Sequence, residues 1–229
     1  MQMKALVWGG LGSLADCADL DLAAWNGAFR AQGLDWSWNW DTYAELMRPG
    51  GDRQLAARFA AFRGEVVQAE EIDKIHQKLF AARLSAGIHL RPGVIELLKW
   101  SARSGVKLAM VSRSETEPVR ALLSATARAR EGITFDVAVL RGDVTRMAPD
   151  PDAMERCLEQ LNLQPSEVLA IVDTPATAQG AQAAGIPCLA FTGRLASSED
   201  FPSDIPHANV LTVATAMEAW QQTSSQAAE

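Results

Sequence analysis

The sequence predicts an α/β protein, in which a doubly wound and mostly parallel sheet carries an inserted α-helical cap. Two observations lead to this prediction. Short, almost wholly apolar runs recur along the chain, as at 168–172 (VLAIV), and such runs are typical of parallel strands that are covered on both faces. Helical stretches separate these runs, and this alternation of strand and helix is the pattern of a Rossmann-like core.

The apolar runs are the expected strands. Because most of them contain hardly any polar residue, we expect helices on both faces of the sheet. The runs lie at 4–8, 107–111, 135–140, 168–172, 187–191 and 209–213.

Three of the expected helices have clear start and stop signals. The stretch 91–105 places Pro92 near the start of a helix and Gly105 just past its end. The stretch 149–162 has proline and acidic residues in its first turn, and 174–185 ends at a glycine. These signals place one helix after each of three expected strands.

A helical segment interrupts the alternation after the first strand. Apolar residues recur there at helical spacing, as at Leu22 and Trp25, and no convincing strand is present. We therefore expect an α/β core made of residues 1–14 and 86–229, with a helical cap of residues 15–85 inserted into it.

Composition excludes several classes of protein. The chain has 229 residues, of which 48% are hydrophobic and 21% charged, as in an ordinary globular protein of one large or two modest domains. Its net charge of −7 argues against nucleic acid or an anionic membrane as a partner. No apolar run is long enough to cross a membrane, and a strand begins at once, so we expect no signal peptide and a cytoplasmic protein.

Side chains that often bind metals are scattered in this sequence. The cysteines are odd in number and widely spaced, which predicts neither a disulfide framework nor a zinc site. The histidines have no partner nearby in the sequence, so we assign them no metal site and no nucleophile–base pair. These residues are Cys17, Cys157, Cys188, His76, His89 and His207.

The loop after the first strand attracts attention because reactive side chains often lie at the carboxyl end of a central strand. The loop runs from Gly9 to Ser13 and offers glycines, one leucine and one serine. It has the form of a site for chemistry without the usual reactive groups.

Longer phrases carry a specific family resemblance. AFRAQGLDWSWNWDTYAELM lies in the expected cap, LRPGVIELLKWSARSGVKLAMVS leads into the second strand, and the stretch from FDVAVLRGDV to AAGIPCLAF covers most of the remaining core. The chain resembles the haloacid dehalogenase (HAD) superfamily in its β-phosphoglucomutase-like branch, and within that branch it is similar to the CbbY-type sugar-bisphosphate phosphatases. The resemblance implies the HAD fold with a helical cap.

The same resemblance implies a catalytic loop that this sequence does not keep. Members of the family carry Asp-x-Asp-Gly-Thr/Ser-Leu after the first strand. The first Asp is the nucleophile and a Mg²⁺ ligand, and the second is the general acid/base. Here Gly9 stands at the nucleophile position and Leu11 at the acid/base position. Neither side chain can attack phosphorus, transfer a proton or ligate a metal.

The other family motifs are kept in part. The Ser or Thr that ends the second strand and binds phosphate is matched by Ser112, whereas Ala148 replaces the Lys of Lys-Pro-x-Pro-Asp. The acidic pair that holds Mg²⁺ is reduced to Val172 and Asp173. One carboxylate is too few to hold Mg²⁺ without a neighbour or a bound phosphate, so we expect the Mg²⁺ of the family to be lost.

Two hypotheses on function follow. The first is a pseudoenzyme, a non-catalytic protein that binds a protein partner or senses a small anionic metabolite. It is favoured because replacing a whole ionic cluster by small or apolar groups can be neutral for stability. The alternative is a HAD-superfamily hydrolase or phosphatase that acts on a small phosphorylated metabolite through an atypical nucleophile such as Ser13, Ser112 or Asp16.

Four residues are candidates for ligand binding. Ser13 and Ser112 would flank the backbone N–H groups of the first loop, which can bind an anion. Arg113 either takes a phosphate or carboxylate of the ligand, or pairs with Asp173. Arg53 lies in a cap segment that resembles the substrate-specificity loop of the family.

Overall fold

The computed structural model describes residues 2–47, 54–129 and 133–226 and contains a five-stranded sheet. All neighbouring strands pair in parallel, in the order β3-β2-β1-β4-β5, so the first strand of the chain is central. This confirms the predicted doubly wound fold. The strands are β1 (Ala5–Gly9), β2 (Lys107–Ser112), β3 (Val137–Leu140), β4 (Val168–Val172) and β5 (Cys188–Ala190).

Side chains of β1 alternate between the two faces of the sheet. Leu6 and Trp8 belong to one hydrophobic cluster, whereas Ala5 and Val7 belong to the other, as the two-residue period of a strand requires. All of these side chains are buried, which explains why the strand reads as a continuous apolar run.

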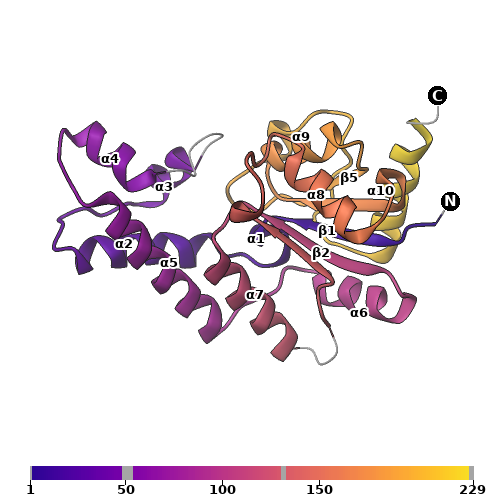
Figure 1. Ribbon diagram of the computed structural model, residues 1–229, viewed down its shortest axis with the longest axis horizontal. Coiled ribbons are helices and arrows are strands. Elements are labelled where there is room, and N and C mark those ends of the chain that lie inside the picture. Colours follow the sequence, from indigo (N-terminus) through magenta and orange to yellow (C-terminus); the bar gives the residue numbers. More distant parts are fainter. Residues whose placement is uncertain (1, 48–53, 130–132, 227–229) are drawn as a thin grey trace.

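Helices cover both faces (Figure 1). Apolar residues of α6, α7 and α10 pack in the cluster of Leu6 and Trp8, and those of α8 and α9 pack in the cluster of Val7. Short 3-10 helices lie in the connections. The core helices are α1 (Leu11–Leu14), α6 (Val94–Ser104), α7 (Thr116–Ala129), α8 (Asp152–Leu161), α9 (Pro175–Ala183) and α10 (Val213–Gln226), with η1 (Arg141–Asp143), η2 (Pro165–Glu167) and η3 (Ser198–Asp200).

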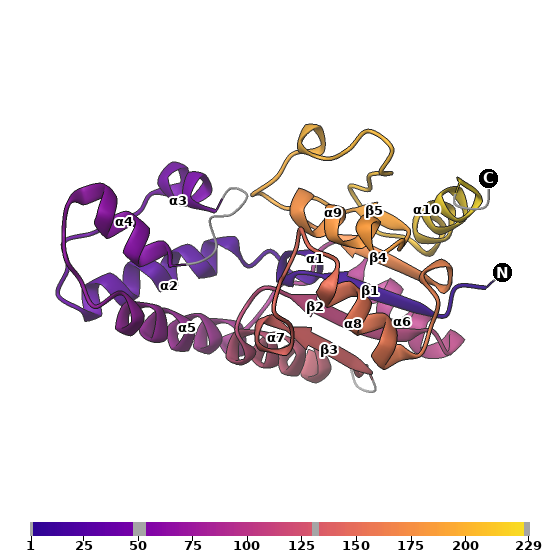
Figure 2. The same cartoon turned by 45° about the horizontal axis from the view of Figure 1, so that its top comes forward.

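A second lobe of helices stands beyond the carboxyl edge of the sheet (Figure 1). It consists of α2 (Ala18–Ala31), α3 (Trp40–Leu46), α4 (Leu55–Arg63) and α5 (Ala69–Ala86). We call this lobe the cap. The long helix α5 lies alongside α7, which joins the cap to the core (Figure 2).

Aromatic packing gives the cap a core of its own. The Phe29 ring meets Trp36 and Trp38 edge to face, with centroids 5.3 and 4.7 Å apart. All of these rings are buried, and Trp25 packs beside Trp38 at 5.1 Å. The cap tryptophans at 36 and 38 therefore stabilise the lobe by packing rather than by offering an exposed stacking surface.

One of the predicted strands differs from the structure. The run 209–213 is not a strand, because the chain pairs with β5 earlier, through the N–H of Ala208 to the carbonyl of Ala190 at 2.9 Å. Leu211 then turns inward and donates its N–H to Pro92 at 3.2 Å, and its carbonyl lies so close to Gly93 that any β-carbon there would collide with it. An apolar run can therefore be buried without forming the backbone hydrogen bonds that pair one strand with another.

None of the helices within residues 2–47, 54–129 and 133–226 has the length and apolar character needed to cross a membrane.

Candidate functional site

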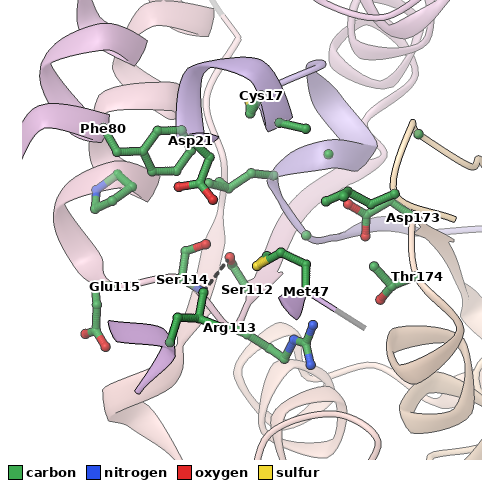
Figure 3. Close-up of a pocket in the computed structure, with 18 of the residues that line it drawn as sticks. Cys17, Asp21, Met47, Phe80, Ser112, Arg113, Ser114, Glu115, Asp173 and Thr174 are labelled. Carbon is green, nitrogen blue, oxygen red and sulfur yellow. Dashed lines mark hydrogen bonds between the residues drawn. The ribbon is translucent and has the colours of Figure 1, made fainter. Parts of the chain in front are cut away.

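A cavity of about 280 Å³ lies between the cap and the carboxyl edge of the sheet. Its core wall comes from the segments that follow β1, β2 and β4, and its cap wall comes mainly from α2, α3 and α5. Figure 3 shows the side chains around it. In doubly wound folds, ligands bind outside the carboxyl ends of the strands, so this cavity is the candidate site.

The first loop is shorter than the sequence predicts. Gly9 still belongs to β1, where it pairs with Val111 and Val172, and Leu11–Leu14 form a single helical turn. Gly10 has φ of 107°, a backbone conformation that favours glycine. The loop therefore turns sharply away from the strand at Gly10.

Ser13 does not line the cavity. It is fully buried, and its hydroxyl donates to the carbonyl oxygen of Gly10 at 2.7 Å. The structure therefore contradicts the prediction that Ser13 contacts a ligand. The short helical turn directs this side chain back into its own loop.

Asp173 is the carboxylate that lies against the first loop. A β-carbon on Gly10 would stand 2.6 Å from Oδ1 of Asp173, and one on Gly12 would collide with Oδ2. Burial raises the pKa of Asp173 to about 6, although the charges of Arg113 and Arg91 and the backbone N–H of Gly12 act in the opposite direction. Asp173 can therefore accept or release a proton near neutral pH.

Arg91 holds the first loop from behind. Its guanidinium donates to the carbonyl oxygens of Gly12 at 2.9 Å, Phe191 at 2.7 Å and Thr192 at 2.5 Å. Its Cζ also lies 3.4 Å from the centroid of the Phe191 ring. Arg91 thereby ties the loop after β1 to the segment after β5, and it was missed because its backbone partners cannot be identified from the sequence.

The end of β2 supplies the polar groups of the core wall. Ser112 is 2% exposed, and its Oγ accepts the N–H of Ser114 at 3.1 Å (Figure 3). Arg113 extends along the cavity toward Thr174 (Figure 3), and its charge favours the ionised form of Asp173. Both predicted residues, Ser112 and Arg113, therefore line the cavity.

Arg141 supports this wall from the loop after β3. Its Nε donates to the carbonyl oxygen of Arg113 at 2.7 Å and lies 3.5 Å from Oε1 of Glu115. Arg141 also lines the cavity, so two guanidinium groups belong to the same wall.

The positions where the sequence departs from the family lie at or below the floor of the cavity. Leu11 and Ala148 line the cavity, whereas Val172 is fully buried beneath it, in register with Gly9. A β-carbon on Gly9 would stand 2.6 Å from Cγ2 of Thr177 and 3.1 Å from Cγ1 of Val172. The space beside Gly9 is therefore already filled.

The cap wall holds a buried hydrogen-bonded group that the sequence did not indicate. Both oxygens of Asp21 are engaged, Oδ2 by the hydroxyl of Tyr43 at 2.7 Å and Oδ1 by Nε2 of His76 at 2.6 Å. Burial and the adjacent Asp21 carboxylate raise the pKa of Tyr43 well above its usual value. The His76 ring stacks on Trp25 with centroids 3.8 Å apart.

The sequence places no partner near His76, and the partner appears only in the folded protein. Its partner Asp21 is 55 residues away and comes from another helix, so only the packing of α5 on α2 brings them together. The helical periodicity of both segments was the one available signal, because it predicted that they pack. The candidate Arg53 lies outside the described residues.

Cys17 also lines the cavity. Burial raises the pKa of Cys17 to about 12, and the carboxylates of Asp21, Asp173 and Asp16 add to this effect. The thiol is therefore protonated at neutral pH and is a poor nucleophile.

The residues present suit a Mg²⁺ ion that is held jointly by the protein and by phosphate oxygens of a ligand. Within the described ranges, no group of three or more His, Cys, Asp or Glu side chains is placed to hold a metal. Proteins often hold Mg²⁺ by one or two carboxylates together with phosphate oxygens of the substrate. Asp16 lines the cavity and could supply the protein's carboxylate in such a site.

Comparisons with known proteins agree with this geometry. Residues 12–185 match the family described as haloacid dehalogenase-like hydrolase. The chain is 31% identical to protein CbbY of Rhodobacter capsulatus, over 88% of this chain and 90% of that one. The crystal structure of CbbY from Rhodobacter sphaeroides in complex with phosphate has a TM-score of 0.84 at 26% identity, covering 94% of this chain and 100% of that one. The same protein, as a mutant in complex with xylulose-1,5-bisphosphate, has a TM-score of 0.83 at 26% identity, covering 94% of this chain and 99% of that one.

These matches correct one prediction. The expectation that the Mg²⁺ of the family has been lost is wrong, because the chain matches the hydrolase family over most of its length and the comparisons carry no sign of a lost cofactor site. The prediction counted carboxylates in the motifs alone. It gave too little weight to the phosphate oxygens that a bound ligand would add.

The fold, the position of the cavity and the match over residues 12–185 all lead to one assignment. The resemblance to the CbbY branch extends over both the core and the cap, since the alignment with the Rhodobacter capsulatus protein covers 88% of the chain. The chain belongs to the haloacid dehalogenase-like hydrolase family.

Proposed function

We propose that the chain is a hydrolase that acts on a small phosphorylated metabolite in the cavity between cap and core. One observation carries the proposal. Ser112, Arg113 and Asp173 lie at the carboxyl ends of β2 and β4, the two strands that pair with β1. All three line the cavity that the cap covers. Two similar structures are complexes of CbbY, one with phosphate and one with xylulose-1,5-bisphosphate, which supports a phosphorylated ligand here.

The core wall has the chemistry that a phosphate group needs. Arg113 and Arg141 line the cavity, and guanidinium groups bind phosphate oxygens through paired N–H donors. The buried hydroxyl of Ser112 lies beside them and can donate a further hydrogen bond. The phosphate of the ligand would therefore lie at this wall.

Asp173 is the proposed general base. In this role it takes a proton from a water molecule, whose oxygen forms a bond to phosphorus while the ester P–O bond breaks. The proton then passes from Asp173 to the departing alkoxide, so the products are inorganic phosphate and an alcohol. A pKa of about 6 suits this exchange because it lies near the working pH. Mg²⁺, when bound, would neutralise charge on the phosphate oxygens.

A second candidate function is binding without turnover. In this case the chain would bind a metabolite or a protein partner and would not hydrolyse a phosphate ester. It is favoured by the positions of the family's two catalytic carboxylates, where this chain has Gly9 and Leu11. The side chains of Thr177 and Val172 already fill the space beside Gly9. Covalent transfer of phosphate to position 9 is therefore impossible in this protein.

One assay separates the two candidates. Phosphate release from a panel of sugar and alkyl phosphates is measured with Mg²⁺, and binding of the same ligands is measured by calorimetry. We expect release by the wild type, at least a hundredfold loss in Asp173→Asn, and no loss in Asp35→Asn, whose side chain is 84% exposed. Binding without release would favour the second candidate, and absence of both would contradict the proposal.

A further inference from the structure

The segment after β5 reaches from the core to the cap. Gly193, Arg194 and Leu195 line the cavity, and Figure 2 shows the chain after β5 extending toward α3 before it turns back to η3. We call residues 193–195 the strap. The strap lies on the opposite side of the cap–core junction from α5 and α7 (Figure 2). It is therefore placed to hold the side of the cap that is far from the contact between α5 and α7.

One side chain of the strap contacts two helices of the cap. Nη1 of Arg194 donates to both carboxylate oxygens of Asp19, at 2.7 and 2.6 Å, and Cζ of Arg194 lies 4.0 Å from the centroid of the Trp40 ring. Asp19 is in the first turn of α2, and Trp40 begins α3. The guanidinium group therefore binds the cap through an ion pair and a cation–π contact at the same time.

The root of the strap is fixed where the cap joins the core. Arg91 donates to the carbonyl oxygens of Phe191 and Thr192, directly before the strap. The two chain segments that lead into and out of the cap pair beside this point, through the antiparallel bridge between Ala15 and Leu90. A rotation of the cap about these paired segments would leave the root of the strap in place. Such a rotation would therefore have to break the contacts that the tip of the strap makes with the cap.

The contacts of Arg194 suit a reversible latch. The side chains of Arg194 and Asp19 are 49% and 65% exposed, and ion pairs of this kind contribute little and are screened by salt. The cation–π contact with Trp40 adds a contribution of similar size. Together the two contacts should change the ratio of open to closed molecules by about tenfold. That is enough to favour the closed cap and small enough for the cap to open again.

We propose that Arg194 latches the cap over the cavity, and that release of Asp19 and Trp40 opens the cavity to a ligand. The consequence for ligand entry rests on the proposed function, because that function makes the cavity the binding site. The latch itself does not rest on it and can be tested in the protein without a ligand.

The first test measures the distance between cap and core in the ligand-free protein. Spin labels are attached at Ala61→Cys on α4 and Gln179→Cys on α9, which are exposed helical positions. The chain without this pair controls for labelling of the native cysteines, which are buried. Double electron–electron resonance should detect a second, longer distance whose population relative to the first rises about tenfold in Arg194→Ala. High salt should raise this population in the wild type but not in Arg194→Ala, because salt screens the ion pair.

Three further variants complete this test. Asp19→Asn and Trp40→Leu each remove one contact and should produce smaller rises, and they test the latch from the cap side if Arg194→Ala does not fold. Arg156→Ala removes an arginine that is 50% exposed and pairs with Glu159 within α8, so it should leave the distances unchanged. The same distance distribution in the wild type and in all latch variants, or an equal shift in Arg156→Ala, would overturn the inference.

The second test measures ligand entry with glucose 6-phosphate as the probe. Stopped-flow tryptophan fluorescence gives its association rate constant, which should rise about tenfold in Arg194→Ala if binding requires the open cap. A shift in distance with an unchanged rate constant would overturn the role of the latch in ligand entry. If the distances shift but neither glucose 6-phosphate nor inorganic phosphate binds, the latch stands and the proposed function fails. If the ester binds and the distances do not shift, the inference fails and the proposed function stands.

Discussion

The γ-methyl group of Thr177 stands 2.6 Å from the point where a β-carbon on Gly9 would lie. Gly9 is the last residue of β1, and Thr177 is in the first turn of α9, so the two meet where the helix crosses the strand end. The hydroxyl of Thr177 is held at 2.8 Å from that of Thr174, which fixes the direction of the methyl group. The glycine and the threonine therefore form a matched pair.

This pair leads to a test by double substitution. Gly9→Ala adds one methyl group to a filled space and should lower the free energy of unfolding by about 1–3 kcal/mol. Thr177→Ser removes the opposing methyl but keeps the hydroxyl, so it should restore most of that loss in the double variant. Urea denaturation of the four proteins measures the coupling between the two positions. Strictly additive effects would show that these side chains do not compete for space.

Asp173 should make stability depend on pH. Its pKa in the folded protein, about 6, is raised above the ordinary value of 3.8, because burial disfavours the charged form. The contribution of Asp173 to the free energy of unfolding is therefore largest at low pH, and it is lost as the pH rises through about 6. The total lost is about 1.4 kcal/mol for each unit by which the folded pKa exceeds the unfolded pKa.

The variant Asp173→Asn checks this dependence. It should flatten the fall in the free energy of unfolding between about pH 4 and pH 6.5, and at neutral pH it should be at least as stable as the wild type. Asp35→Asn, at an exposed position, is the control and should leave the slope unchanged. The same slope in wild type and Asp173→Asn would contradict the assignment.

Arg91 should be a major support of the first loop. Arg91→Lys keeps the charge but cannot reach three backbone carbonyl oxygens at once, and the loss should be about 2–4 kcal/mol in the free energy of unfolding. Arg103→Lys, on the exposed surface of α6, should cost less than about 0.5 kcal/mol. Thermal and urea denaturation compare the two. Equal small losses would mean that the Arg91 contacts contribute little.

Mg²⁺ should act together with a phosphorylated ligand. The described residues supply few carboxylates to the site, so Mg²⁺ without a ligand should leave the melting temperature unchanged. When a phosphorylated ligand is present, Mg²⁺ should tighten its binding about tenfold or more. Calorimetry with and without Mg²⁺ measures this difference, and Asp16→Asn should abolish it. A rise in melting temperature on adding Mg²⁺ to the ligand-free protein would contradict this expectation.

Local patterns determined most of the fold in advance. Apolar runs at 168–172 and 107–111 are strands in the structure because side chains buried on both faces must be apolar at every position. Helix ends were equally readable, since Gly105 has φ of 68° at the end of α6, a conformation that glycine adopts without strain. The strand predicted at 209–213 was wrong because an apolar run indicates burial but does not show that a neighbouring strand is available for pairing.

The candidate site was predicted only where a family motif marked it. Ser112 ends β2, Arg113 follows it directly, and Asp173 directly follows β4. The carboxyl ends of parallel strands meet at one edge of a sheet whatever the details of packing. Their convergence could thus be predicted from the sequence. The direction of the Ser13 hydroxyl could not, because it depends on a single turn of helix after Gly10.

Tertiary structure alone decided the cap wall and the support of the first loop. Asp21 and His76 are 55 residues apart, and Arg91 reaches Phe191 across 100 residues. Secondary structure follows from periodicity within a few turns of chain. Hydrogen bonds between distant side chains depend on how helices dock, and no local pattern encodes that docking.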